Sequence, residues 1–85
     1  MKITFTVDGG GMKQNRELSG MSQKELAEKT GLSVRMIQNY EQGANDLNGA
    51  RLSTLLKICL ALGCGLSGII TDPETRELLE KYEAL

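Results

Sequence analysis

Two short amphipathic segments joined by a tight turn lie in the middle of the chain. The first begins at Ser22 and ends at Gly31, and the second begins at Ser33 and ends at Gly43. Ser22 and Glu25 are three residues apart, which is the spacing of a capping box at a helix start. A glycine just beyond a helix commonly adopts the left-handed conformation that ends it. The pattern therefore predicts two capped helices in a helix-turn-helix arrangement.

The second of these helices, over residues 34–42, carries a polar outer face. It would be about 13 Å long at a rise of about 1.5 Å per residue. The major groove of B-DNA is about 12 Å wide and admits a helix of this size. The residues alone leave two interpretations open: a DNA-binding unit, and an ordinary helical hairpin inside a bundle.

Helical spacing continues on both sides of this unit. It predicts helices over roughly Met12 to Ser19 and from Leu52 to Leu62, where Gly63 ends the helix, and a short helix over Leu66 to Ile70. The stripe expected to be buried in the second of these consists of Leu52, Leu55, Leu56, Cys59 and Leu62. Leu60 lies off that stripe, either as a contact for a partner or as a solitary surface leucine.

The two ends of the chain have patterns of their own. Residues 2–7 alternate apolar residues with threonines, which is typical of a strand, and the glycine-rich segment 8–11 then breaks the pattern as a hinge. Three interpretations of this arm stay open: pairing with its twin across a dimer, disorder, or an upstream extension, with Met12 resembling a true start.

A last helix is expected from Asp72 onward, since Asp72 can cap it and Pro73 suits its first turn. Its apolar stripe consists of Leu78, Leu79, Tyr82 and Leu85, and its outer ion pairs would be Glu77–Lys81 and Arg76–Glu80. The stripe is expected to pack back on its own domain or, nearly as readily, on a second subunit.

Composition narrows the classes of function. The 85 residues suffice for one domain, and at 40% hydrophobic content no apolar run approaches the length of a membrane span, which favours a cytoplasmic protein. The chain has no histidine, and Cys59 and Cys64 alone do not make a zinc site. Their spacing is expected to turn the two thiols away from each other. No phosphate loop and no nucleophile–base pair occurs, so we expect no enzyme activity, cofactor or metal.

The segment SQKELAEKTGLSVRMIQNYEQG closely resembles the Cro/repressor-type (XRE) family of helix-turn-helix regulators. The resemblance extends from about Met12 to Ile70. It is carried by Arg16, Ser22, Gln23, Leu26, Ala27, Gly31, Ser33, Ile37, Tyr40, Glu41, Gly43 and the run LLKICLALG.

The resemblance implies an all-α, five-helix, lambda-repressor-like DNA-binding domain over residues 12–71. A strand-like or disordered arm (residues 1–11) would precede it and an extra C-terminal helix (residues 72–85) would follow. It also implies a structural ion pair between Arg16 and Glu41. Asn15 departs from the family pattern, which usually has an aliphatic residue there, and should weaken the first helix.

The resemblance also places residues on the DNA. On the side of the second helix that faces DNA in the family, this chain carries Ser33, Val34, Arg35, Gln38 and Asn39. Arg35 suits guanine, Gln38 or Asn39 suits adenine, and Val34 suits a thymine methyl group. Gln23 and Ser33 lie at helix N-termini and suit phosphate oxygens.

Charge sets the expected strength of binding. The net charge is −1, but residues 72–85 carry −3 and residues 12–71 carry +2. The expected DNA face gathers Lys13, Lys24, Arg35 and Arg51, with Asp46 as the main opposing charge. Only a few phosphates would be neutralised per subunit, so useful affinity requires a homodimer on a palindromic operator in double-stranded DNA.

Two functions from different classes follow. The first is a sequence-specific DNA-binding transcriptional regulator, in the form of a dimeric repressor that reads the major groove with helix 34–42. The alternative is a protein-interaction module with the same fold, antitoxin-like or anti-repressor, whose docking element for a protein partner is the arm or the last helix.

Overall fold

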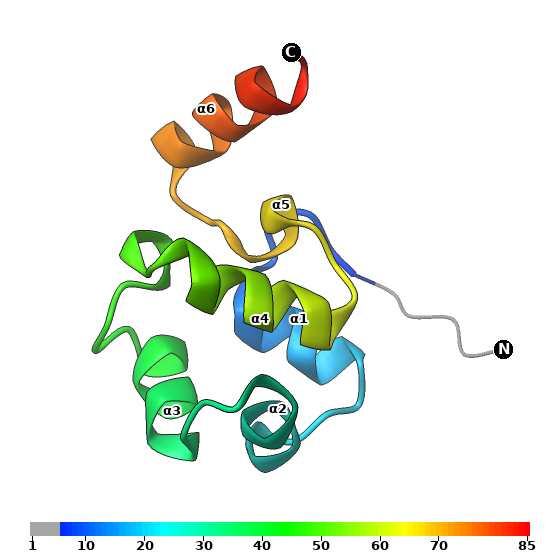
Figure 1. Cartoon of the computed structure of the whole chain (residues 1–85), viewed down its shortest axis with the longest axis vertical. Coiled ribbons are helices and arrows are strands. Elements are labelled where there is room, and N and C mark those ends of the chain that lie inside the picture. Colours follow the sequence, from blue (N-terminus) through cyan, green and yellow to red (C-terminus); the bar gives the residue numbers. More distant parts are fainter. Residues whose placement is uncertain (1–5) are drawn as a thin grey trace, which may run out of the picture.

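Helices account for all the regular structure in the part of the chain that the computed structural model describes, residues 6–85 (Figure 1). In chain order they are α1 (Gly11–Leu18), α2 (Gln23–Thr30), α3 (Val34–Gln42), the short 3-10 helix η1 (Leu47–Gly49), α4 (Leu52–Leu62), α5 (Leu66–Ile69) and α6 (Pro73–Glu83). No strand occurs within residues 6–85. The all-α prediction is confirmed, and the helix bounds agree with the expected ones to within about one turn.

The core lies where α1 to α5 meet. Leu26 of α2, Ile37 of α3 and Ile58 of α4 are fully buried there. The other buried apolar residues are Met12, Ala27, Leu47, Leu55, Cys59, Leu62, Ile69 and Ile70. Ala27 keeps the side chain small where α2 packs against both α3 and α4. The core therefore fixes α3 against α2 from one side and leaves its other side at the surface.

Both halves of the helix-turn-helix begin as the sequence predicts. The Ser22 hydroxyl accepts a hydrogen bond from the Glu25 backbone N–H (3.0 Å), and the Glu25 carboxylate accepts one from the Ser22 N–H (3.2 Å), which completes a capping box. Ser33 caps α3 by accepting from the Met36 N–H (3.1 Å). Gly31 has φ +76°, so the turn between the helices uses the left-handed conformation that favours glycine. The tight turn thus sets the direction in which α3 starts.

The contacts of Asn15 do not support the expectation that this residue weakens α1. Its side chain is fully buried, and its Oδ1 accepts a hydrogen bond from the Val7 N–H at 2.6 Å. Its Nδ2 lies within hydrogen-bonding distance of the carbonyl oxygens of Val7, Gly11 and Gly68, at 3.2, 3.1 and 2.8 Å. A leucine would bury more apolar surface but could satisfy none of these groups. Asn15 therefore ties the arm, α1 and α5 together.

The arm is only partly described, since residues 1–5, which include residues 2–5 of the predicted strand, lie outside the described residues. Thr6 and Val7 are not in a strand, because the side chain of Asn15 takes the backbone groups of Val7. The glycine-rich segment is no hinge either. Gly9 donates its N–H to the Ser67 carbonyl at 2.7 Å, and the Asp8 carboxylate accepts from the Ser67 hydroxyl at 2.7 Å. This segment is fastened to α5.

The outer face of α4 differs from the expectation. Leu55, Cys59 and Leu62 are buried as predicted, but Leu52 and Leu56 are exposed, in line with Leu60. These three leucines are four residues apart, so they share one face of the helix. The core stripe of α4 also includes Ile58. The sequence pattern of an almost wholly apolar helix did not show which side faces the core.

Both cysteines are free thiols, and Cys59 is buried while Cys64 is half-buried. The chain turns after Gly63, and the Cys64 N–H donates to the Cys59 carbonyl at 3.1 Å. Burial, together with the neighbouring thiol, raises the pKa of Cys59 to about 12. Burial likewise raises the pKa of Cys64. Both thiols are therefore protonated and weakly reactive at neutral pH.

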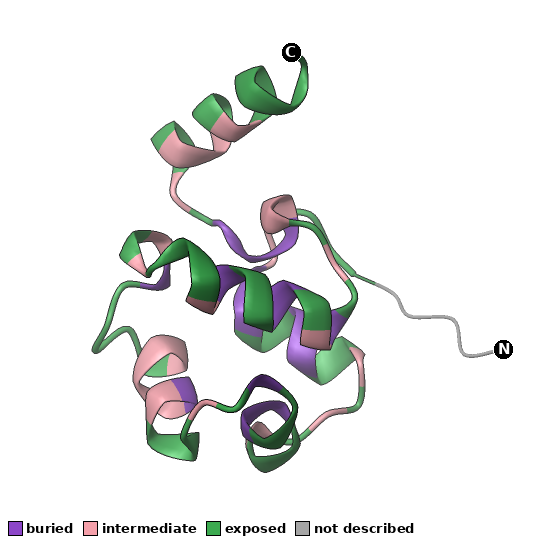
Figure 2. Ribbon diagram, in the orientation of Figure 1, coloured by how far each residue is buried: buried purple, intermediate pink, exposed green. Residues whose placement is uncertain are grey.

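The last helix, α6, projects from the rest of the molecule (Figures 1 and 2). None of its residues is buried, so the expected packing of its apolar stripe onto its own domain is wrong. The Glu77–Lys81 ion pair is present at 3.3 Å, but Arg76 contacts the carbonyl oxygens of Ser67 and Ile70 in place of Glu80. None of the helices in residues 6–85 combines the length and the apolar character needed to cross a membrane.

Candidate nucleic-acid interface

The predicted contact residues lie on α3, at the start of α2 and just before α4. The structure exposes Lys24, Ser33, Val34, Arg35 and Arg51 and leaves Gln23, Gln38 and Asn39 half-buried. Ile37 faces inward from the same helix and is fully buried. One side of α3 therefore anchors it to the core while the opposite side presents polar residues to solvent, as a recognition helix requires.

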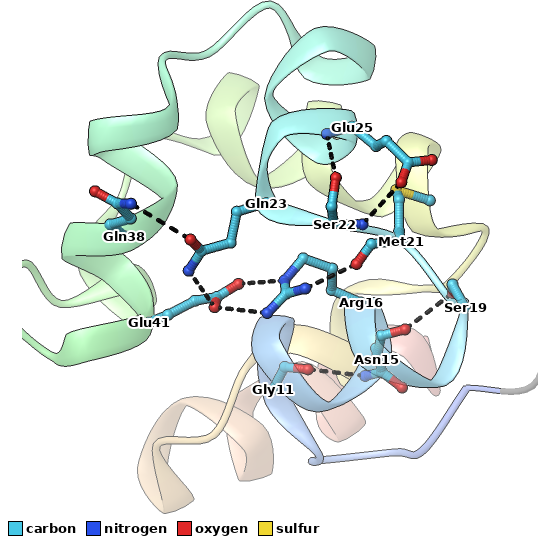
Figure 3. A network of polar contacts seen from close by, with 10 residues as sticks. All are labelled: Gly11, Asn15, Arg16, Ser19, Met21, Ser22, Gln23, Glu25, Gln38 and Glu41. Carbon is cyan, nitrogen blue, oxygen red and sulfur yellow. Dashed lines mark hydrogen bonds and ion pairs between the residues drawn. The ribbon is translucent and has the colours of Figure 1, made fainter.

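A polar network connects α1, α2 and α3 below this surface (Figure 3). Arg16 donates to both carboxylate oxygens of Glu41, from Nε at 2.7 Å and from Nη2 at 3.0 Å. Its Nη1 donates to the Met21 carbonyl at 2.7 Å. This arrangement confirms the ion pair that the family resemblance implied. Bidentate geometry of this kind fixes both the distance and the orientation between the two helices.

Gln23 extends the network to Gln38 on α3 (Figure 3). Its Nε2 donates to Glu41 at 3.0 Å, and its Oε1 accepts from Gln38 Nε2 at 3.4 Å. The start of α2 is thereby connected to the middle of α3 by side chains. The family resemblance places Gln23 and Gln38 on the DNA separately and does not predict this connection. The connection becomes visible only in the folded structure, because Gln23 and Gln38 are 15 positions apart in the sequence.

The charges of the network are neutralised within it. The side chain of Glu41 is 3% exposed and that of Arg16 is 11% exposed. Burial acts to raise the pKa of Glu41, but hydrogen bonds from Arg16 and Gln23 and the charges of Arg16 and Lys13 outweigh it and lower the pKa. The hydrogen bond to Glu41 raises the pKa of Arg16. Glu41 is therefore ionised and paired, and it opposes a bound phosphate far less than a free carboxylate would.

The four cations of the expected DNA face are all exposed. The charge of Lys13 acts on Glu41 and helps to lower the pKa of that carboxyl. Within residues 6–85, Lys24, Arg35 and Arg51 form no ion pair, so all three are available to a ligand. Asp46, the expected opposing charge, accepts hydrogen bonds from Asn48 at the start of η1. The Ser33 oxygen accepts the cap bond of α3, and its hydroxyl hydrogen is left for an acceptor such as a phosphate. These features suit a polyanionic ligand that also offers hydrogen-bonding groups.

Comparison with known proteins finds matches to the same part of the chain. A family model described as helix-turn-helix matches residues 12–69, which is most of the chain. The chain is 36% identical over 50 residues to an uncharacterized HTH-type transcriptional regulator of Sinorhizobium medicae and to one of Rhizobium meliloti, a match that covers 59% of this chain and 36% of each relative. A similarly named protein of Sinorhizobium fredii is 37% identical over 49 residues, which cover 58% of this chain and 34% of the relative. The chain thus spans about a third of the length of the curated relatives it matches. No solved structure matches significantly.

Proposed function

Because the chain belongs to the helix-turn-helix family of transcription regulators, we propose that it is a dimeric repressor that binds a palindromic DNA operator. The observation that carries the proposal is the preformed connection between Gln23 and Gln38 beneath a surface with three unpaired cations. A recognition helix in a fixed position loses little entropy on binding. A regulator of this kind acts on cytoplasmic DNA.

Each surface residue has a role in this proposal. Arg35 donates bidentately to guanine O6 and N7, and Asn39 donates to and accepts from adenine. Val34 contacts a thymine methyl group. Lys24 and Arg51 neutralise phosphates on either side of the groove, and the Ser33 hydroxyl and Gln23 bind phosphate oxygens at the starts of α3 and α2. Gln38 both positions Gln23 and faces the groove.

Repression follows from geometry in this proposal. Three cations per subunit give weak, salt-sensitive binding, so a single subunit would leave an operator mostly free. Two subunits related by a two-fold axis bind half-sites about one helical turn apart and double the number of contacts. A dimer seated on such a site covers a promoter by occupying it, without any further chemistry.

The experiment that tests this function is selection of bound duplexes from a random pool at low salt. We expect an enriched palindromic motif whose affinity falls steeply with salt. Arg35→Ala should lose the preference for guanine at one position of each half-site, at a cost of about 1–3 kcal/mol. Arg35→Lys is the matched control, since it keeps the charge and the salt dependence but loses the bidentate contact.

Two outcomes would contradict this function. One is a pool that yields no motif at low salt. The other is a protein partner whose binding survives Arg35→Ala but disappears when residues 72–85 are deleted, which would favour the protein-interaction module.

A further inference from the structure

The position of α6 is fixed at its base although the helix itself projects. Arg76 Nη1 donates to the carbonyl oxygens of Ser67 and Ile70, at 2.7 and 2.9 Å, and so joins α6 to α5. The Asn48 Oδ1 accepts from the N–H groups of Thr71 and Asp72, at 2.8 and 3.1 Å, and so joins the linker to η1. The helix therefore presents its side chains in a definite direction.

The side chains that α6 presents form an apolar stripe with acidic neighbours. Leu78, Tyr82 and Leu85 lie at helical spacing and are 57%, 70% and 99% exposed. Residues 72–85 carry a charge of −3, and one of their two cations, Arg76, is turned toward α5. The stripe is thus an unpartnered amphipathic helix face in an acidic segment.

A second unpartnered apolar face lies on α4, and its surroundings are basic. Leu52, Leu56 and Leu60 are 61%, 44% and 84% exposed along this face. Beside the last of them, a shallow depression of about 380 Å³ between α2 and α4 is lined by Lys29, Lys57, Leu60 and Ala61. The lining combines two cations with apolar atoms and contains no acid. It complements α6 in both polarity and charge.

We propose that α6 of one copy of the chain docks in the α2–α4 depression of a second copy, and that the exchange is reciprocal. A two-fold axis then buries the α6 stripe and the Leu60 end of the α4 face twice, and the lysines of each depression meet the acids of the partner's helix. Pairing of α6 with α6 would bring two segments of −3 charge together. Packing of α6 on its own α4 is not what the structure shows, since the helix projects away from the body (Figure 1).

The proposed contact leaves the DNA surface free. Arg51 precedes the start of α4, whereas Leu60 lies near its end, about 13 Å further along the helix at about 1.5 Å per residue. The inference specifies the dimer of the proposed function and rests on it only for its biological purpose. Association can be measured without DNA, so the two proposals fail separately.

The test is sedimentation equilibrium of the full chain over a range of concentrations, without DNA. We expect a monomer–dimer equilibrium that weakens with salt. Leu60→Glu damages the depression and Tyr82→Glu damages the helix, so each should raise the dimer dissociation constant about tenfold or more. Both side chains are mostly exposed, so both variants should fold, as circular dichroism will show. Leu18→Glu, an exposed site on α1, is the matched control and should dimerise normally.

Mixing the two damaged variants gives the decisive result. A mixed dimer keeps one intact contact, between the sound α6 of the Leu60→Glu chain and the sound depression of the Tyr82→Glu chain. The mixture should therefore associate more tightly than either variant alone. The proposal is overturned by a chain that stays monomeric, by open-ended assembly beyond dimers, or by a mixture that gains nothing. It is also overturned if Tyr82→Glu abolishes association while Leu60→Glu has no effect, which would show that α6 pairs with itself.

Discussion

The helices of the α2–α3 unit and α6 have the same kind of N-terminal cap, but they differ in how far their side chains are buried. Each helix has a capping side chain at its start: Ser22, Ser33 or Asp72 accepts from the backbone N–H three residues on. Hydrogen bonds from Thr75 also lower the pKa of Asp72. Yet α2 and α3 bury Leu26 and Ile37 completely, and α6 buries nothing (Figure 2).

Helix capping and side-chain burial are therefore separate properties, although one sequence pattern suggests both. A cap acts within one turn and decides where a helix starts. Burial depends on whether another element covers the apolar stripe, and in the α2–α3 unit the Arg16–Glu41 pair supplies a further cross-helix connection. Removing contacts should therefore be costly in the α2–α3 unit and nearly free in α6.

The largest effect is expected from Glu41→Ala. It leaves the Arg16 guanidinium without its carboxylate in a site where the arginine side chain is only 11% exposed. Breaking a buried pair in this way should lower the free energy of unfolding by about 3–5 kcal/mol, measured by urea denaturation. Glu83→Ala on α6 is the control and should change it by less than about 0.5 kcal/mol. Equal effects of the two substitutions would refute the contrast between the regions.

A smaller effect is expected from Asn15→Leu, which restores the aliphatic residue that the family pattern has. The substitution removes the partners of the Val7 N–H and of the Gly68 carbonyl. The free energy of unfolding should fall by about 1–3 kcal/mol, and amide hydrogen exchange at Val7 should accelerate. Gln14→Leu, at the exposed neighbouring position, controls for added apolar surface. An Asn15→Leu protein as stable as the original would show that this asparagine does not fasten the arm.

A smaller loss of stability is expected at acid pH, because protonation neutralises the Glu41 carboxylate but leaves its side chain in place. The folded-state pKa of Glu41 lies below its ordinary value. Its contribution is therefore complete above the ordinary glutamate pKa of about 4.3 and is lost as the pH falls through the lower, folded-state value. Urea denaturation from pH 7 to pH 3 should show a loss of stability that is smaller in Glu41→Gln. Parallel curves for the two proteins would mean that Glu41 does not contribute to acid sensitivity.

The smallest effect is expected from Leu78→Ser on α6. At concentrations where the chain is monomeric, the free energy of unfolding, measured by thermal denaturation, should change by less than about 0.5 kcal/mol, because the leucine is mostly exposed. The matched removal of apolar atoms in α3, Ile37→Ala, should cost about 2–5 kcal/mol. A large cost for Leu78→Ser in the monomer would mean that α6 packs on its own domain in solution.

Local signals made the fold largely predictable from the sequence. The serine caps and the glycine stops gave the bounds of α2 and α3, and the family resemblance supplied the Arg16–Glu41 pair. The exposed side of α4 could not be predicted, because leucines on nearly every face of a helix leave its orientation undetermined.

Long-range polar contacts escaped prediction for a related reason. Asn15 contacts Gly68 across 53 positions, and Gln23 contacts Gln38 across 15. No periodicity within one helix predicts which asparagine or glutamine will find a partner on another element. The predicted DNA contacts stay predictions, although the structure leaves all of them exposed or half-buried.

The Gln38–Gln23–Glu41 connection bears on how new binding specificities arise in this scaffold. Arg35 and Asn39 make no side-chain hydrogen bond within residues 6–85, so in the proposed complex their exchange alters base preference alone. Gln38 is different, because replacing it also removes one of the two hydrogen bonds that hold the Gln23 side chain, the other being its bond to Glu41. A recognition helix grafted onto this chain should therefore keep Gln38 or replace it together with Gln23. In the proposed complex with an operator, Gln38 meets the same restriction, since it does not vary independently of Gln23.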